Sequence, residues 1–470
     1  MTDSTAPGKF KRYFSLFRQA VAGSEQDYTV GSIRRAVILL AIPMVLEMCL
    51  ESVFALVDIF FVGKLGNAAV ATVGFTESVL SIVYSLAMGL SMAATALVAR
   101  RVGEKNYAEA AHAGMQVIFV AIVLSLIMSV TGVMFAGEIL HLMGATPQVV
   151  AQNVRYTEIM YGGNIVIMLL FLINGVFRGA GDASIAMRSL WISNGCNIIL
   201  CPLLINGLGP IPALGLPGAA IATTIGRGIG VLYQLYRLFF KRGLLTFYLA
   251  QIKPQRDLLL QIFDIGSTAA VQFLISSGSW IFLNRLVANF HEAASAGYQI
   301  AIRLLIFFLL PAWGMSNAAA TLVGQNLGAG QPDRAEKSVW ITSGYITIFM
   351  ICVTAIFYLF GQPIVSFMNS DPHARSFATQ ALRTISLGYI FFGVEMVMLN
   401  AFNGAGDSRT PTVVNLIGFW LLQIPLAWVL SKQYIKGPMG IFVAILISQF
   451  ATALMSYFLF KHGRWKRVKV

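Results

Sequence analysis

Three acidic residues, Glu47, Glu51 and Asp58, lie in one apolar stretch of the chain, where an ionised side chain is costly. In an α-helix they fall within about 40° of one another around the axis and form one stripe. Such a stripe is tolerated beside a water-filled interior or a basic partner. Its carboxyl groups can load and release a proton, or their oxygens can bind Na⁺. The stripe therefore predicts an ion site; the alternative is structural pairing with Arg227 or Arg303.

Other polar residues also fall inside apolar stretches. Glu77 lies early in the second stretch, and Glu395 lies in the middle of a late one. Both are candidates for binding the coupling ion or the substrate. Asn197 and Cys201 are one helical turn apart and would otherwise be read as packing residues. Pro43 precedes the acidic stripe and removes a backbone hydrogen bond, so it predicts a helix that can bend.

The composition indicates what positions these residues. Of 470 residues, 57% are hydrophobic and only 11% are charged, whereas a soluble domain carries about a quarter charged residues. The apolar residues recur in blocks long enough to cross a membrane. We therefore predict an all-α integral membrane protein with transmembrane helices at 36–62, 70–98, 112–136, 154–177, 184–206, 217–240, 258–289, 295–322, 337–360, 378–402, 410–431 and 438–460.

The basic residues test this count. With the N-terminus in the cytoplasm, 24 of the 33 Lys and Arg residues fall on the cytoplasmic side. This explains most of the net charge of +13 and argues against nucleic-acid binding. We expect a multi-pass protein of the inner membrane with both termini cytoplasmic. Residues 9–21 predict a basic helix on the membrane surface, with a disordered basic tail as the alternative.

The second half of the chain repeats the first. Residues 94–103 resemble 319–328, and 178–182 (Arg-Gly-Ala-Gly-Asp) match 403–407 (Asn-Gly-Ala-Gly-Asp), both at a shift of 225 residues. The shift spans six helices, so it predicts two bundles in the same orientation, related by an axis along the membrane normal. The Gly-Ala-Gly-Asp segments are interpreted as tight turns between helices, since they lack the other residues of a nucleotide motif.

These patterns divide the chain into five segments. They are a basic N-terminal segment, a first six-helix lobe, a linker, a second six-helix lobe and a basic tail, at 1–35, 36–240, 241–257, 258–460 and 461–470.

The chain resembles the multidrug and toxic compound extrusion (MATE) family, in its DinF-like prokaryotic branch. The resemblance covers residues from about 30 to 460. It rests on Ile-Pro at 42–43, Val-Asp-Ile-Phe-Phe-Val-Gly at 57–63, Leu-Val-Gly-Gln-Asn-Leu-Gly-Ala-Gly at 322–330, and the two Gly-Ala-Gly-Asp turns.

The resemblance implies a V-shaped pair of lobes that exports cationic, amphiphilic compounds against inward H⁺ or Na⁺. It implies that Asp58 is the coupling acid and that Pro43 is the proline at which helix one, the first predicted transmembrane helix (36–62), bends. Tyr156 and Asn197 match a tyrosine and an asparagine of the same lobe, and Glu51 matches a polar residue before the aspartate. Asp58 and Asn197 are the candidate Na⁺ ligands.

The chain also departs from the family. Cys201 stands where the family often has an aspartate, which weakens a Na⁺ site. Gln272 is the nearest polar residue to an acid that other branches carry in helix seven, and Glu395 is a candidate to replace part of that site. Glu47 and Glu51 add acidity to helix one, which favours H⁺ over Na⁺.

The sequence thus predicts a monomeric antiporter with no enzymatic activity and no cofactor, whose partners are cationic drugs or dyes and the lipid bilayer. The alternative is a flippase for lipid-linked glycans, although the acidic stripe favours cations. The candidate ion-coupling residues are Asp58, Glu51, Asn197, Tyr156 and Glu395. The candidate substrate-binding residues are Glu47, Glu51, Asp58, Glu77, Asn174 and Gln272.

Overall fold

The computed structural model describes residues 9–23, 26–207, 209–210, 212–241, 243–247 and 253–468. The predicted linker and the two terminal segments therefore lie partly outside the described residues. All the regular secondary structure of the described residues is helical, as expected in lipid, where each backbone polar group must be satisfied within its own segment.

The first half folds into one bundle, the N-lobe. Its helices are α2 (Ile33–Gly63), α3 (Asn67–Gly103), α4 (Tyr107–Met134), α5 (Ala136–Leu142), α6 (Pro147–Gly162), α7 (Asn164–Ala180), α8 (Ala183–Asn206) and α9 (Leu216–Phe239). The second half folds into the C-lobe. Its helices are α10 (Arg256–Ala288), α11 (Glu292–Gly328), α12 (Pro332–Met368), α13 (Pro372–Gly404), α14 (Arg409–Asn415), η2 (Leu416–Gln423), α15 (Ile424–Val429), η3 (Leu430–Tyr434) and α16 (Pro438–His462).

A long helical segment corresponds to each of the twelve expected transmembrane segments. Among the described residues, eleven helical segments are long and apolar enough to cross a membrane, with α6 and α7 counted as one. The twelfth is α9, which carries Arg227 and Arg237 and has the same length as α8. Each lobe has its own buried apolar core, which confirms the predicted division into two bundles.

Two predicted helices differ in detail. The segment predicted at 154–177 is divided at Gly163 into α6 and α7, where an added Cβ would collide with Thr224 of α9. The segment predicted at 410–431 alternates between α-helix and the wider π-helix in η2 and η3. Hydropathy did not predict either change, because both depend on how the segment packs against its neighbours.

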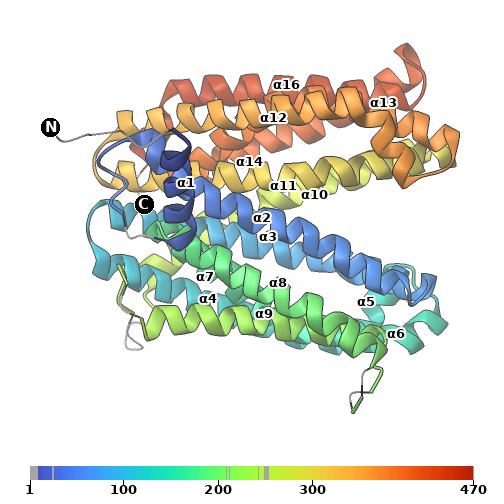
Figure 1. Cartoon of the computed structure of the whole chain (residues 1–470), viewed down its shortest axis with the longest axis horizontal. Helices are drawn as coiled ribbons and strands as arrows, with labels where there is room; N and C mark the ends of the chain where they lie inside the picture. The colour runs from blue at the N-terminus through green and yellow to red at the C-terminus, as the bar shows by residue number, and fades with distance from the viewer. Residues whose placement is uncertain are drawn as a thin grey trace.

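The N-terminal segment forms the predicted helix, α1 (Lys9–Ala22), rather than a disordered tail. It packs on α2, and Arg188 of α8 donates hydrogen bonds to the carbonyl oxygens of Val21 (2.8 Å) and Ala22 (2.6 Å). Phe14 and Phe17 remain exposed. Helix α1 and the last described residues, at the C-terminal side of the chain, lie at the same end of the molecule, here called the terminal side (Figure 1).

The lobes contact each other closely on the terminal side, as the two layers of helices in Figure 1 show. Gly103 of α3 lies against the backbone of Gln325 in α11, and Gly328 of α11 lies against the backbone of Arg100 in α3. These contacts are related by the shift of 225 residues, so they form a reciprocal pair across the pseudo-twofold axis. An added Cβ at either glycine would collide with the opposite backbone.

The predicted tight turns also lie on this side. Gly181 and Gly406 have φ of 89° and 88°, values in the left-handed region that favours glycine. Hydrogen bonds from the C-lobe reach the first turn: Thr321 donates to the Arg178 carbonyl oxygen (3.1 Å), and Gln325 donates to that of Gly179 (3.0 Å). The first of these segments is therefore both a turn and a part of the lobe interface.

Candidate functional site

The half-buried carboxyl group of Asp58 lies on α2 and faces α8. The Cys201 thiol of α8 lies 3.9 Å from Asp58 Oδ1, within reach of a weak S–H hydrogen bond. Asn197, one turn earlier on α8, donates instead to Thr223 of α9 at 2.9 Å. The two candidate Na⁺ ligands therefore lie on facing helices, and the Asn197 amide is hydrogen-bonded to α9.

Arg227 is the buried cation beside this group. Its guanidinium donates to the Tyr84 hydroxyl at 2.7 Å and lies 5.4 Å from the centre of that ring. Its charge acts on Asp58 and Glu51. The predicted pairing of the acidic stripe with Arg227 is thus electrostatic, without a salt bridge among those found in the described chain. Arg303 is exposed.

Two further predicted residues join this cluster. Glu77 of α3 is exposed, and its charge interacts with those of Asp58 and Arg227. Tyr156 of α6 is buried and lies within the electrostatic range of Glu77 and Asp58. Four helices, α2, α3, α6 and α9, thus bring two carboxyl groups, one guanidinium and two phenol rings together.

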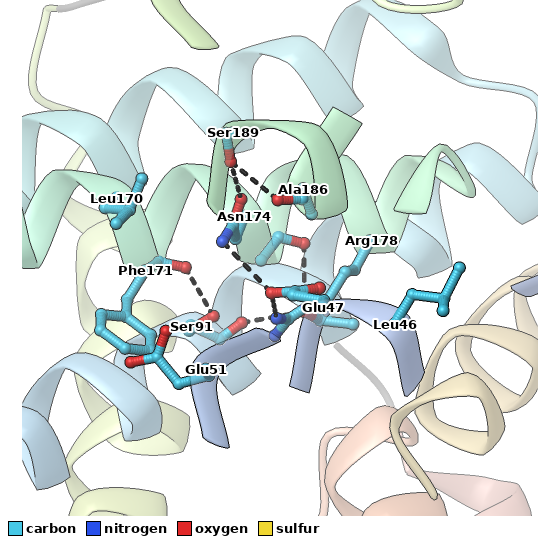
Figure 2. Close-up of polar contacts among 12 residues, drawn as sticks. Leu46, Glu47, Glu51, Ser91, Leu170, Phe171, Asn174, Arg178, Ala186 and Ser189 are labelled. Atoms are coloured by element: carbon cyan, nitrogen blue, oxygen red, sulfur yellow. Dashed lines mark hydrogen bonds and ion pairs between the residues drawn. The ribbon is translucent and has the colours of Figure 1, made fainter. Parts of the chain in front are cut away.

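Glu47 precedes Asp58 by three helical turns of α2, and Figure 2 shows its environment, with Arg178 and Asn174 beside it. Its fully buried carboxylate forms an ion pair with Arg178 of α7, while its Oε2 has no hydrogen-bond partner in the described part of the chain. Asn174 donates to Glu47 Oε1 at 3.4 Å. Burial and pairing make Glu47 a structural group in this conformation, and its partner is Arg178 rather than the predicted Arg227 or Arg303.

A network of neutral polar groups surrounds the ion pair. The Asn174 carbonyl oxygen accepts hydrogen bonds from Ser189 (3.2 Å) and Gln234 (2.6 Å). Asn174 is thus tied to the interior of the N-lobe and is fully buried. Glu51 lies between the two levels and accepts a hydrogen bond from Asn194 at 2.9 Å. The predicted stripe is confirmed as one face of α2, but its members have three different sets of partners.

The two C-lobe candidates lie apart from the N-lobe acids. Glu395 of α13 is fully buried, and Thr452 of α16 donates to its Oε2 at 2.6 Å. Its other oxygen has no hydrogen-bond partner among the residues that the structure describes. Gln272 of α10 accepts a hydrogen bond from Asn403 at 3.3 Å. Gln272 and Glu395 therefore belong to separate parts of the C-lobe.

Pro43 lies within α2, which continues without a break from Ile33 to Gly63. The helix is thus unbroken at its predicted bending point in this conformation. Sequence reasoning missed Tyr84, Asn194 and Arg178 as members of the site. One signal could have identified Arg178: it is a basic residue in the last turn of an apolar helix, where it can reach the depth of Glu47.

Comparisons with known proteins agree with this architecture. A family model described as MatE matches residues 43–203 and 268–429. The "Probable multidrug resistance protein NorM" of Thermotoga maritima is 26% identical over 458 residues, covering 97% of each chain. The "FAD transporter" of Shewanella oneidensis is 27% identical over 427 residues, covering 91% of this chain and 94% of that one. A crystal structure of MATE in complex with MaL6 superposes with a TM-score of 0.89 at 24% identity, covering 94% of this chain and 99% of that one.

Proposed function

We infer that this chain, which belongs to the MatE family of membrane transporters, exports cationic and amphiphilic compounds in exchange for H⁺ or Na⁺. The observation that carries the proposal is the N-lobe cluster, where Asp58 and Glu77 lie with two phenol rings around Arg227. Carboxylates and aromatic faces both attract organic cations. The names of the relatives describe multidrug resistance proteins and an FAD transporter, so they support export of small organic molecules.

The proposed exchange begins with Asp58. Uptake of H⁺ or Na⁺ at Asp58 removes its negative charge, so the charges of Glu77 and Arg227 then cancel and the cluster no longer attracts a bound cation. The same neutralisation allows α2 to bend at Pro43, where one backbone hydrogen bond is missing. The lobes then rock, the ion leaves on the other side, and the carboxylate again attracts a cation. No cofactor is needed in this scheme.

Cys201 makes H⁺ the favoured ion. A thiol is a poor ligand for a hard cation such as Na⁺, which prefers oxygen ligands. A proton needs only one carboxyl oxygen. Glu395 is the second candidate proton carrier, because it is a buried acid that accepts a hydrogen bond from the neutral Thr452 hydroxyl. We propose further that the protein is a monomer in the inner membrane with both termini in the cytoplasm.

The test is transport of ethidium, a fluorescent cation, in proteoliposomes with a pH gradient and a Na⁺ gradient imposed separately. The proposal expects the pH gradient alone to drive ethidium against its own gradient. Vesicles without protein give the background. Ethidium movement that ignores both gradients contradicts antiport. Binding of an anionic lipid-linked sugar without binding of ethidium favours the flippase.

A further inference from the structure

A cavity of about 250 Å³ lies in the C-lobe among α10, α11, α13 and α14. Its polar wall is formed by amide and hydroxyl groups at helical spacing: Gln272 and Ser276 on α10, Asn400 and Asn403 on α13, and Asn415 at the end of α14. Residues four or three positions apart share one face of a helix, so the two stripes face the cavity together.

Two amide oxygens of this wall lack a partner. Asn403 uses its Nδ2 to donate to Gln272 (3.3 Å), and Asn415 uses its Nδ2 to donate to Ser276 (3.0 Å). The Oδ1 atoms of both residues are buried without a hydrogen bond from any described residue, and the residues are 2% and 4% exposed. Buried carbonyl oxygens are normally paired, so both are acceptors for a ligand's N–H group.

Aromatic rings form the rest of the wall. Trp280, Trp313, Phe273, Phe392 and Phe419 line the cavity, and Phe273 meets Trp313 edge to face with ring centres 5.8 Å apart. Flat slots between aromatic rings favour flat ligands, which can stack or pack edge to face. The volume suits a ring system more closely than a whole drug-sized molecule.

The cavity carries no formal charge. None of the described residues that line it is ionisable. An organic cation therefore meets no carboxylate here, in contrast to the N-lobe cluster around Asp58, and its charge is attracted only by neutral dipoles and aromatic faces. Amide side chains combine N–H donors with a carbonyl acceptor, and so match a ligand edge that has the same combination.

We propose that this cavity binds flat, uncharged heteroaromatic compounds with an imide or lactam edge, whose N–H donates to Asn403 or Asn415. Binding stands independently of the function proposed above, whereas export of the bound compound rests on it. Met88 of α3 is the one lining residue from the N-lobe, so movement of the lobes changes the wall of the cavity. The N-lobe would thus load the ion, and the C-lobe would bind the ligand.

The test uses riboflavin, whose ring system is flat, uncharged at neutral pH and fluorescent, and has an imide edge. Binding to the purified protein in detergent is measured by fluorescence quenching. The matched probe is N3-methylriboflavin, which lacks only the imide N–H. The proposal expects methylation to weaken binding by about tenfold, the effect of one lost hydrogen bond in a dry site.

Variants of the wall give the second arm. Asn403→Leu and Asn415→Leu are each expected to weaken riboflavin binding by about tenfold, and Asn284→Leu, the same change elsewhere on α10, is expected to leave it unchanged. Because Asn403 also holds Gln272, its variant can fail to fold, whereas the comparison of the two probes needs only the wild-type protein. Equal binding of both probes overturns the proposal, and so does unchanged binding in folded variants at both asparagines. Asp58→Asn is expected to keep riboflavin binding while ethidium transport is lost, so failure of either proposal is recognised separately.

Discussion

Arg178 and Glu47 form an ion pair that is buried between α7 and α2. At the same positions of the second repeat, 225 residues later, Asn403 and Gln272 form a hydrogen bond between neutral amides at 3.3 Å. The duplicated fold therefore keeps the contact between two helices and changes its charge. This difference separates an acidic N-lobe from a neutral cavity in the C-lobe.

The two fully buried glutamates are expected to respond differently to the same substitution. Glu47→Gln leaves the Arg178 guanidinium buried without a counter-ion, a change that costs about 3 to 5 kcal/mol in comparable cases. Glu395→Gln removes no ion pair, and the new amide oxygen can still accept from Thr452. Thermal unfolding in detergent should therefore show a much lower Tm for the first variant and little change for the second. Equal Tm values would contradict the structural role of Glu47.

A double variant tests the cause of that loss. Glu47→Gln combined with Arg178→Asn copies the amide pair of the C-lobe into the N-lobe. It is expected to recover a large part of the stability lost in Glu47→Gln alone, because no charge is then left unpaired. The measurement is again the Tm, with Arg178→Asn alone as the fourth corner of the cycle. A double variant less stable than both single variants would show that the ion pair is not the cause.

The sequence predicted the frame of the fold better than the contacts of the site. Twelve apolar blocks and a repeat at one shift are enough to define two six-helix bundles. The spacing of Glu47, Glu51 and Asp58 also placed them on one face of α2. It could not show that Glu47 pairs with Arg178 while Asp58 faces Cys201, because helix rotation and the depth of neighbouring helices decide which side chains meet.

The sequence did not predict the C-lobe cavity, for a related reason. Asn400, Asn403 and Asn415 are neutral residues near the end of one helix and in the next, and nothing in their spacing separates a cavity from ordinary helix packing. The free oxygens of Asn403 and Asn415 exist only because their amide nitrogens are already engaged.

Asp58→Asn is expected to abolish ethidium transport driven by either ion gradient, because the neutral asparagine side chain can neither take up a proton nor offer a charged oxygen to Na⁺. A loss of at least a hundredfold in rate is expected if Asp58 is the coupling acid. The control is Asp264→Asn on α10, an exposed acid paired with Arg409 at the surface, which is expected to transport at about the wild-type rate. Wild-type transport by Asp58→Asn would remove Asp58 from the mechanism.

Cys201→Asp is expected to increase the dependence on Na⁺. The new carboxylate would replace a thiol that lies 3.9 Å from Asp58, so two acidic side chains would share one site. Such a site binds a hard cation better than one carboxylate does. The measurement is ethidium transport driven by a Na⁺ gradient at constant pH. Cys201→Asn adds oxygen without charge and is expected to gain less; equal gains would point to volume or polarity instead of charge.

Gly103→Ala and Gly328→Ala are expected to open the terminal side. Each added Cβ would collide with the backbone of the opposite lobe, at Gln325 and Arg100 respectively. Spin labels on the two lobes at this side should show a longer mean distance in each variant. Gly344→Ala, in the middle of α12 with nothing near the added carbon, is the control. Distances that stay at the wild-type value in both variants would show that the interface accommodates the added methyl groups without the lobes moving apart.

The π-helical turns of η2 have a consequence for selectivity. Asn415 immediately precedes η2, and Phe419 lies within it; both line the C-lobe cavity. A wide turn holds about one residue more than an α-turn, and a slip of one residue rotates a helix by about 100°. Narrowing η2 to α geometry would therefore turn one of these side chains away from the cavity while the other stays in place. A change of η2 between π and α geometry would therefore change which side chains line the cavity, and so which compounds it binds, without moving either lobe.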